Sequence, residues 1–415
     1  MINKRKEKDK RTRAKRGIVL VMLTGCFLTG CWDHVEIQER GFVLGVAIDK
    51  ASPLPMKQET DYRSERDIEK MPLQKGEPSY TYTIQVPIIV FAKNQPTGVA
   101  GGGAEADATW NMTIQGKSFM EANRQYSTRT NYPPFYEHLQ AIIISEDVAR
   151  EGITASIDLF LRDHEMRRRT RVFITPGEAK TVLDVQPRIE DYPAMYLAQL
   201  PFNASKTSRI LHKTDLGEMS ELLHAGADFV LPRVVATKDE IKDAGAAVFK
   251  GDKMVGWLGE LDTIYLKWVR DAVLGGVIVV SMPNDPESVV TLEIKSAKTK
   301  VRPKVEGNGI KMDIRVKAEF SLAEKTEAHF RNALDEDFLK ELETKAERDL
   351  RENMEDTVRY VQKEFGADIF LFNLAMERYA PDTWDQVKDK WADIFPQVEV
   401  AVSVKAKIAE IGTMK

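Results

Sequence analysis

The chain has 415 residues, 43% of them apolar and 30% charged, so it is long enough to bury the cores of two or three globular domains. Its only cysteines, Cys26 and Cys31, lie near the N-terminus, which excludes disulfides, cysteine-ligated metals and a cysteine nucleophile from the rest of the chain. Sixty basic residues face 64 acidic ones, and this balance disfavours a nucleic-acid partner, which needs a basic face.

Residues 1–30 have the layout of a cleaved signal peptide. Nine Lys or Arg residues and two acids lie between Lys4 and Arg16. A run of apolar and weakly polar residues without any charge follows from Gly17 to Gly30. This order is typical of a secretory signal. The alternative, an uncleaved transmembrane anchor, needs about 20 apolar residues, and this run is shorter. Removing the leader leaves 51 basic and 62 acidic residues, a net charge of −11, which also argues against a body that lies on anionic lipid.

The residues that end the leader predict a lipid anchor. Leu28, Thr29 and Gly30 precede Cys31 in the order of a lipobox, a large apolar residue and two small ones before the modified cysteine. Residues 23–26 repeat these residue types, but cleavage before Cys26 would leave an apolar segment at the lower end of the usual range of about 7–15 residues. We therefore predict that Cys31 becomes an N-palmitoyl, S-diacylglycerol cysteine and that this lipid holds the exported body at a membrane.

Residues 31–205 predict a first α+β domain. Apolar periodicity predicts strands over 42–48, 80–88, 110–114, 139–144 and 171–174, and helices over 117–128 and 147–161. The segment 50–77 holds six acids and six bases but few large apolar residues, so we expect a surface loop. The glycine-rich segment 98–106 predicts a second loop.

Residues 206–285 predict a middle domain. The expected helices are 216–223 and 263–272, and the expected strands are 229–235, 244–249, 254–258 and 277–280. Gly251-Asp252 has the composition of a hairpin turn between two of these strands.

Residues 286–415 predict a third domain with the clearest pattern. Strands over 290–294, 310–320 and 398–408 alternate apolar with polar residues, as in an antiparallel sheet with one solvated face. From Phe338 to Phe365, apolar residues recur every three or four positions, which predicts a covering helix of about 28 residues with Gly366 at its C-cap. The predicted fold class is α+β, with three consecutive mixed domains, each a mainly antiparallel sheet with packed helices, after the signal peptide.

No residue pattern points to catalysis, a cofactor or a metal. The six histidines are scattered without metal-ligand spacing: His34, His138, His164, His212, His224 and His329. Gly116-Lys117-Ser118 resembles the end of a phosphate-binding loop, but Asn111 stands where that loop requires glycine, so we predict a strand-to-helix turn. We predict no catalytic, cofactor-binding or metal-binding residue, and a protein that is not an enzyme.

Two further patterns near the C-terminus have a structural and a functional interpretation. Trp384, Val387, Trp391 and Ile394 lie at helical spacing, and we favour core contacts over a binding groove. The acidic residues from Glu341 to Asp349 are typical of a solvated helix face.

Many stretches resemble the C-subunit family of spore germinant receptors, the Ger(x)C lipoproteins. In chain order they are 28–33, Glu36, 43–50, 116–118, 121–122, 138–139, 142–144, 246–249, 255–258, 275–278, 367–370, Tyr379, Pro381, Trp384, Trp391, 395–396 and the last strand to Gly412. They span essentially the whole chain after the leader. Two departures are the segment 50–77, which is longer than usual for the family, and Leu371, which replaces a residue that is typically glycine.

The resemblance implies a three-domain mixed fold and a role as one subunit of a nutrient germinant receptor in an endospore former. The implied partners are a larger membrane A-subunit and a transporter-like B-subunit, and the implied location is the outer face of the inner spore membrane. No active site carries over. The alternative is a substrate-binding lipoprotein of a membrane importer, but that class would show two parallel-sheet lobes around a hinge, unlike the alternating strands after Val290. A cell-wall hydrolase would need paired carboxylates or a metal set, and the sequence singles out neither.

Overall fold

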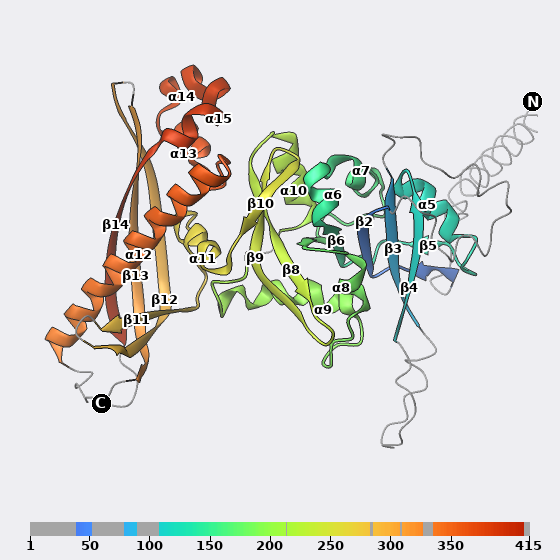
Figure 1. Ribbon diagram of the computed structural model, residues 1–415, viewed down its shortest axis with the longest axis horizontal. Coiled ribbons are helices and arrows are strands. Elements are labelled where there is room, and N and C mark those ends of the chain that lie inside the picture. Colours follow the sequence, from blue (N-terminus) through green and yellow to red (C-terminus); the bar gives the residue numbers. More distant parts are fainter. Residues whose placement is uncertain are drawn as a thin grey trace, which may run out of the picture. The chain divides into compact units, whose positions relative to one another are not determined.

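The computed structural model describes residues 39–51, 79–88, 108–212, 214–282, 285–307, 309–326 and 335–410 (Figure 1). The predicted signal peptide, the lipobox with Cys31, the loop 98–106, nearly all of the segment 50–77, and Gly412 lie outside these residues. Residues Phe42–Lys415 form one compact unit. No helix among the described residues is both long enough and apolar enough to cross a membrane.

The larger sheet has eight strands in the order β10-β9-β8-β7-β6-β2-β3-β4. These strands are β2 (Gly45–Lys50), β3 (Tyr80–Pro87), β4 (Thr109–Gly116), β6 (Ala141–Ser145), β7 (Arg171–Thr175), β8 (Phe229–Ala236), β9 (Ile241–Lys250) and β10 (Lys253–Leu258); β1 (Gly41–Phe42) and β5 (Pro134–Phe135) are two-residue strands outside it. Pairing is antiparallel toward both edges, whereas β2, β6, β7 and β8 run parallel in the centre. The periodicity did not predict these parallel pairs, which form because helical crossovers connect the central strands.

Helices cover both faces of the larger sheet. They are α5 (Phe119–Tyr126), α6 (Glu146–Glu151), α7 (Thr154–Arg162), α8 (Lys180–Asp184), α9 (Pro193–Gln199) and α10 (Leu216–His224), with a 3₁₀ turn over Leu200–Ser205. One buried cluster contains α5, α6, α7 and α10 residues, and a second contains α8 and α9 residues. A sheet covered on both faces accounts for the nearly continuous apolar run of β6.

The single helix predicted over 147–161 is wrong, because two helices meet there at Gly152. Gly152 has φ +125°, a conformation that breaks a helix and favours glycine. The next amide, of Ile153, donates to the carbonyl of Asp252 in the β9–β10 turn over 3.0 Å. The hairpin turn therefore replaces one helical hydrogen bond with a long-range one.

The smaller sheet has the order β11-β12-β13-β14. Its strands are β11 (Val277–Met282), β12 (Asp285–Glu306), β13 (Gly309–Thr326) and β14 (Glu399–Glu410), and the helices around it are α11 (Glu260–Val269), α12 (Glu336–Glu364), α13 (Phe372–Tyr379), α14 (Pro381–Val387) and α15 (Trp391–Ile394), with 3₁₀ turns over Lys388–Lys390 and Phe395–Gln397. The long helix α12 runs across one face of the sheet (Figure 1), as predicted. Gly366 follows it with φ +55°, and its amide donates to the Val361 carbonyl over 3.1 Å, which confirms the predicted C-terminal glycine. β14 is parallel to β13 because the helices form the crossover between them.

The acidic residues of α12 do more than face solvent. Glu343 accepts a hydrogen bond from the amide of Ile408 over 2.8 Å, and Glu347 accepts one from Ala406 over 3.0 Å. About two turns beyond Glu347, Glu355 accepts from the amide of Val402 over 3.1 Å. These carboxylates satisfy the free edge of β14, so the prediction of a purely solvated acidic face is wrong.

The fold is mixed α and β with mainly antiparallel pairing, as predicted. Strands from the two sides of each expected domain boundary pair with one another. β7 and β8 lie on opposite sides of 205/206 and pair through Ile174 and Arg233, and β11 and β12 pair across 285/286. The division into 31–205, 206–285 and 286–415 stays a prediction.

Candidate functional site

Two polar clusters bring together stretches that the sequence analysis singled out. The first centres on Asp368, just before α13, whose side chain is only 5% exposed. Its carboxylate accepts hydrogen bonds from the amides of Phe372 over 3.1 Å and Asn373 over 2.8 Å. Burial raises the pKa of Asp368, although these hydrogen bonds and one from Trp391 lower it. Asp368 thus anchors the start of α13 at a site that is almost closed to solvent.

Trp391 is the side-chain donor to this carboxylate. Its Nε1 donates to Oδ2 of Asp368 over 2.9 Å, and its ring is buried in the core of the smaller sheet. Trp384 meets it edge-on, with ring centroids 5.4 Å apart, and is half-buried. The core interpretation is confirmed for Trp391, but the helix is interrupted, because a 3₁₀ turn separates α14 from α15.

The backbone around Asp368 also binds the β9–β10 hairpin. The amide of Asp368 donates to Asp228 over 2.8 Å, and the other oxygen of Asp228 accepts from the amide of Gly251 over 3.3 Å. Lys250 of the same hairpin donates through Nζ to the carbonyl of Gly366 over 3.0 Å. We call Asp228, Lys250, Gly366, Asp368 and Trp391 the hairpin joint.

Gly256 on β10 completes this contact by its lack of a side chain. A Cβ there would meet Cε1 of Phe365 at 2.4 Å, far inside van der Waals contact. The aromatic ring at the end of α12 therefore lies directly on the β10 backbone. The motif 255–258 therefore packs on the end of α12, two residues before the motif 367–370 begins.

Leu371, where the resemblance expects glycine, lies at the N-cap of α13 with φ +63° and ψ +35°. This left-handed conformation carries a penalty of about 1–2 kcal/mol for a residue with a Cβ. A glycine, as the resemblance implies at this position, would adopt this conformation without that penalty, whereas this chain adopts it with leucine.

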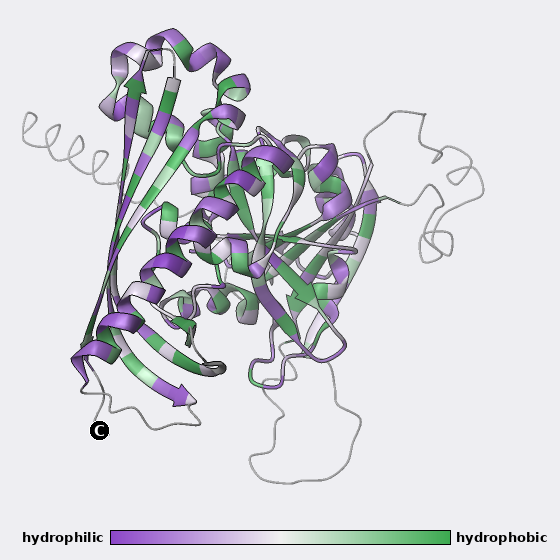
Figure 2. Ribbon diagram, turned by 60° about the vertical axis from the view of Figure 1, so that its left-hand side comes forward, coloured by the Kyte–Doolittle hydropathy of each residue, from purple (hydrophilic) through white to green (hydrophobic). Residues whose placement is uncertain are grey.

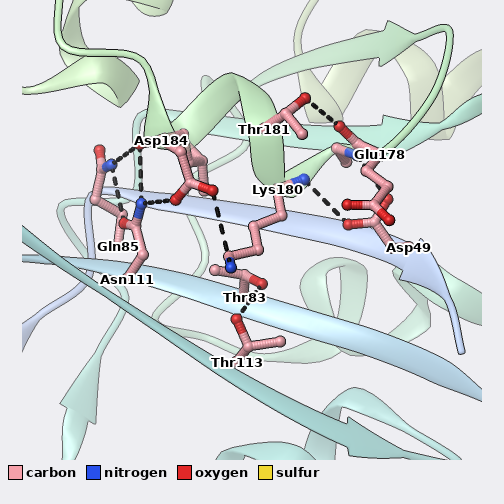
Figure 3. A network of polar contacts seen from close by, with 11 residues as sticks. Asp49, Thr83, Gln85, Asn111, Thr113, Glu178, Lys180, Thr181 and Asp184 are labelled. Carbon is pink, nitrogen blue, oxygen red and sulfur yellow. Dashed lines mark hydrogen bonds and ion pairs between the residues drawn. The ribbon is translucent and has the colours of Figure 1, made fainter. Parts of the chain in front are cut away.

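The second cluster lies where α8 packs on β2, β3 and β4 (Figure 3). The carboxylate of Asp49 accepts hydrogen bonds from the amides of Ala179 over 2.6 Å and Lys180 over 3.0 Å. Burial is the largest influence and raises the pKa of Asp49 to about 6, against these two hydrogen bonds. The acid of the motif 43–50 thus fixes the first turn of a helix 130 residues away.

Amides on β3 and β4 complete this second cluster. Gln85 donates to the Leu183 carbonyl over 2.9 Å and accepts from the amide of Ala194 over 3.1 Å. Asn111 donates to the same carbonyl over 2.9 Å and to Asp184 over 2.8 Å (Figure 3). The residue that argued against a phosphate-binding loop therefore holds the end of α8 on the sheet.

The predicted strand-to-helix turn at Gly116-Lys117-Ser118 is confirmed. Ser118 is the N-cap of α5 and accepts from the amide of Glu121 over 3.3 Å, while Glu121 accepts from the amide of Lys117 over 2.8 Å. This arrangement is a variant of the capping box, in which the glutamate binds the amide of the residue before the N-cap. The amides of Lys117 and Glu121, which could otherwise bind a phosphate, are therefore already hydrogen-bonded.

The two clusters are built to hold elements together. Each buried carboxylate binds backbone amides of its own chain, and among the described residues no group of three or more His, Cys, Asp or Glu side chains is placed to hold a metal. Asp49, Asp368 and Trp391 belong to the motifs that carry the resemblance, whereas Asp228 and Lys250 belong to none of them. Their partners are 116 to 140 residues away, and no local pattern announces such contacts. The lipobox residues Leu28, Thr29, Gly30 and Cys31 lie outside the described part of the chain.

Comparisons with known proteins cover the chain from end to end. A family model described as spore germination protein N-terminal domain matches residues 33–236, and one described as spore germination B3/GerAC like, C-terminal, matches residues 244–412. Spore germination protein YndF of Bacillus subtilis (strain 168) is 31% identical over 98% of this chain and 99% of its own length, and spore germination protein B3 of the same organism is 26% identical over 97% and 99%. The crystal structure of the GerBC protein shares the fold, with a TM-score of 0.57 and 23% identity over 81% of this chain and 96% of that one. The chain belongs to the GerAC-like family of spore germination proteins.

Proposed function

We propose that this protein is the lipid-anchored C-subunit of a nutrient germinant receptor and acts in endospore germination. The end-to-end match to YndF carries the proposal, because it includes both family regions in the same order. Relatives named spore germination protein A3 and KC match over 95% of the chain and support the same role. The proposed partners are the membrane A- and B-subunits of the same receptor.

The proposed location is the outer face of the inner spore membrane, with the lipid on Cys31 as the anchor. The lipobox Leu28-Thr29-Gly30-Cys31 supports it. Each buried methylene of an acyl chain contributes about 0.8 kcal/mol, so two or three long chains make release very slow. A tethered body of this kind needs no membrane-spanning segment of its own.

The proposed role is binding and coupling within a receptor and not catalysis. The hairpin joint and the Asp49 cluster support this, because their carboxylates accept hydrogen bonds from backbone amides of the same chain and so hold its elements in place. Such clusters fix the positions of helices and strands relative to one another. A subunit that presents surfaces to partners needs its elements fixed in this way.

Deletion of the gene tests the proposal. Spores of the deletant should lose the response to one set of nutrients, while growth and sporulation stay normal. Germination by added dipicolinate, which need not pass through the receptor, serves as the control and should persist. A deletant that germinates normally on every nutrient, in a strain without duplicate receptors, contradicts the proposal.

A further inference from the structure

The face of the smaller sheet that points away from α12 collects positive charge. Side chains alternate between the two faces of a strand, and the residues that face α12, such as Met312, Ile314 and Val316, are buried. The opposite positions, 296–304 on β12, 311–319 on β13 and 399–407 on β14, carry nine basic and three acidic side chains. The alternation is visible along these strands in Figure 2. We call this surface the basic sheet face.

Like charges lie directly opposite one another across the strands of this face. Lys317 is in register with Lys298 on one neighbouring strand and with Lys405 on the other. Lys300 faces Arg315, and Lys304 faces Lys311, in the same way. Directly opposed like charges destabilise a sheet. Lys298 binds Asp271, Lys311 binds Glu399, and Asp313 binds both Lys304 and Arg315. The repulsion without a partner charge therefore lies at Lys300, Lys317 and Lys405, where binding of an anionic partner would offset it.

Much of this charge has no counterion within the described residues. Lys300, Lys317, Lys405 and Lys407 are exposed and form no ion pair there. Of the acids on the face, Asp313 is buried and already binds Arg315 and Lys304. The centre of the face is therefore a positively charged surface open to solvent.

The chemistry of the face fits lipid headgroups better than a protein. Lysines dominate it, and its strand positions carry no aromatic residue, whereas protein interfaces are depleted in lysine and enriched in aromatic residues. Clustered lysines gain attraction to an anionic bilayer without any shaped pocket. The net charge of the chain is negative because it sums over all residues, so it does not reveal that basic residues are concentrated on this one face.

We propose that the basic sheet face binds the anionic headgroup surface of a membrane. Such binding would orient the body against the bilayer in addition to any lipid tether. The proposal does not rest on the receptor role, because it concerns only the charge of one face and the headgroups it meets.

Vesicle sedimentation tests the proposal without lipid on the protein. Residues 31–415 carrying Cys31→Ser should bind vesicles with about one third phosphatidylglycerol at about 0.1 M salt, and should be released at about 0.5 M salt because screening shortens the reach of the charges. Pure phosphatidylcholine vesicles should bind at least tenfold more weakly. The triple variant Lys300→Gln/Lys317→Gln/Lys405→Gln should lose at least tenfold in binding, since each lysine near the surface contributes roughly fivefold.

The matched control removes the same charge elsewhere. Lys206→Gln/Lys238→Gln/Lys253→Gln changes three exposed lysines off the face and should change binding by less than about twofold. The face variant should melt no lower than the parent, because it loses cross-strand repulsion. Equal binding to both vesicle types, or equal loss in both triple variants, overturns the proposal. Unchanged vesicle binding with lost receptor assembly in spores also overturns it and assigns the face to an acidic protein surface.

Discussion

At the residue scale, Trp391 combines apolar burial with a hydrogen bond to a buried acid. Its ring lies in the core beside Phe395, and its Nε1 is one of three donors to Asp368. Removing it would open a cavity and leave a buried carboxylate short of a partner. Both effects are among the larger single-residue costs in proteins.

Trp391→Ala should therefore lower the free energy of unfolding by about 3–5 kcal/mol, measured by denaturant titration. Trp391→Phe keeps most of the ring and should cost less, while Trp384→Ala, at a half-buried position, serves as the comparison and should also cost less. An unchanged melting temperature for Trp391→Ala together with failed receptor assembly would mean that the indole is an interface residue and not a core residue.

Asp49 should make stability depend on pH. Its pKa is about 6 in the folded protein against 3.8 as the ordinary value, so the protonated form is favoured by folding. The stabilisation is fully present below about pH 4 and is lost as the pH rises through about 6, with a maximum of about 3 kcal/mol. Asp49→Asn removes this titration, so the variant should gain stability relative to the parent between pH 4 and pH 7. The measurement is a urea unfolding series over this range, and a difference that does not vary with pH contradicts the assignment.

Single residues were predictable where the cause is local. Gly366 after an apolar helix and Ser118 before one follow from capping rules that involve only neighbours. The partners of Asp49 and Asp228 were not, because the amides they bind lie 130 and 140 residues away. Leu371 illustrates a third case, in which the resemblance drew attention to the position but only the backbone shows the left-handed conformation.

At the element scale, the edge of β14 is protected by α12. A strand edge with free amides is a template for pairing with another chain. Glu343 and Glu347 occupy two of these amides, those of Ile408 and Ala406. Their spacing of four residues follows one helix face and matches every second amide along the strand.

The double variant Glu343→Ala/Glu347→Ala should free these amides. We expect a loss of about 1–3 kcal/mol in the free energy of unfolding and concentration-dependent self-association in sedimentation velocity. Glu352→Ala, an exposed position of the same helix, is the control and should do neither. A double variant that stays monomeric and fully stable would show that water replaces the carboxylates without cost.

Elements were predictable wherever one face is wet. α12 and β14 show their periodicity plainly and were expected close to their observed bounds. The strands expected over 290–294 and 310–320 are correct in type but cover only parts of β12 and β13. The strand pairing was not predictable for β6 and β7, because strands buried on both faces show no alternation. Gly152 shows how a long-range contact, here from the β9–β10 turn, overrides a continuous helical pattern.

At the scale of the whole molecule, residues of both sheets belong to one continuous hydrophobic core. The core of the smaller sheet includes residues of β8, β9 and α11, among them Val230, Val248 and Trp268. The hairpin joint adds polar contacts between the same parts. Hydrogen bonds therefore connect the residues before α13 with the β9–β10 hairpin and, through Asp252, the hairpin with the junction of α6 and α7.

The proposed lipid anchor would decide where this body works, and the sequence contains two candidate cysteines for it, Cys26 and Cys31. Cleavage before Cys31 places Trp32, whose amphipathic ring suits the lipid interface, directly at the membrane. Cleavage before Cys26 would instead leave residues 27–30 as an apolar extension and a free thiol at Cys31.

Cys31→Ala should thus abolish lipid attachment and nutrient germination, whereas Cys26→Ala should be nearly silent in both assays. Mass spectrometry of the mature N-terminus gives the direct reading, and a lipid-modified peptide that begins at Cys26, or an unmodified one that begins elsewhere, refutes the assignment. The acyl chains contribute about 0.8 kcal/mol per buried methylene, so the loss of germination should accompany release of the body from the membrane fraction and not its unfolding.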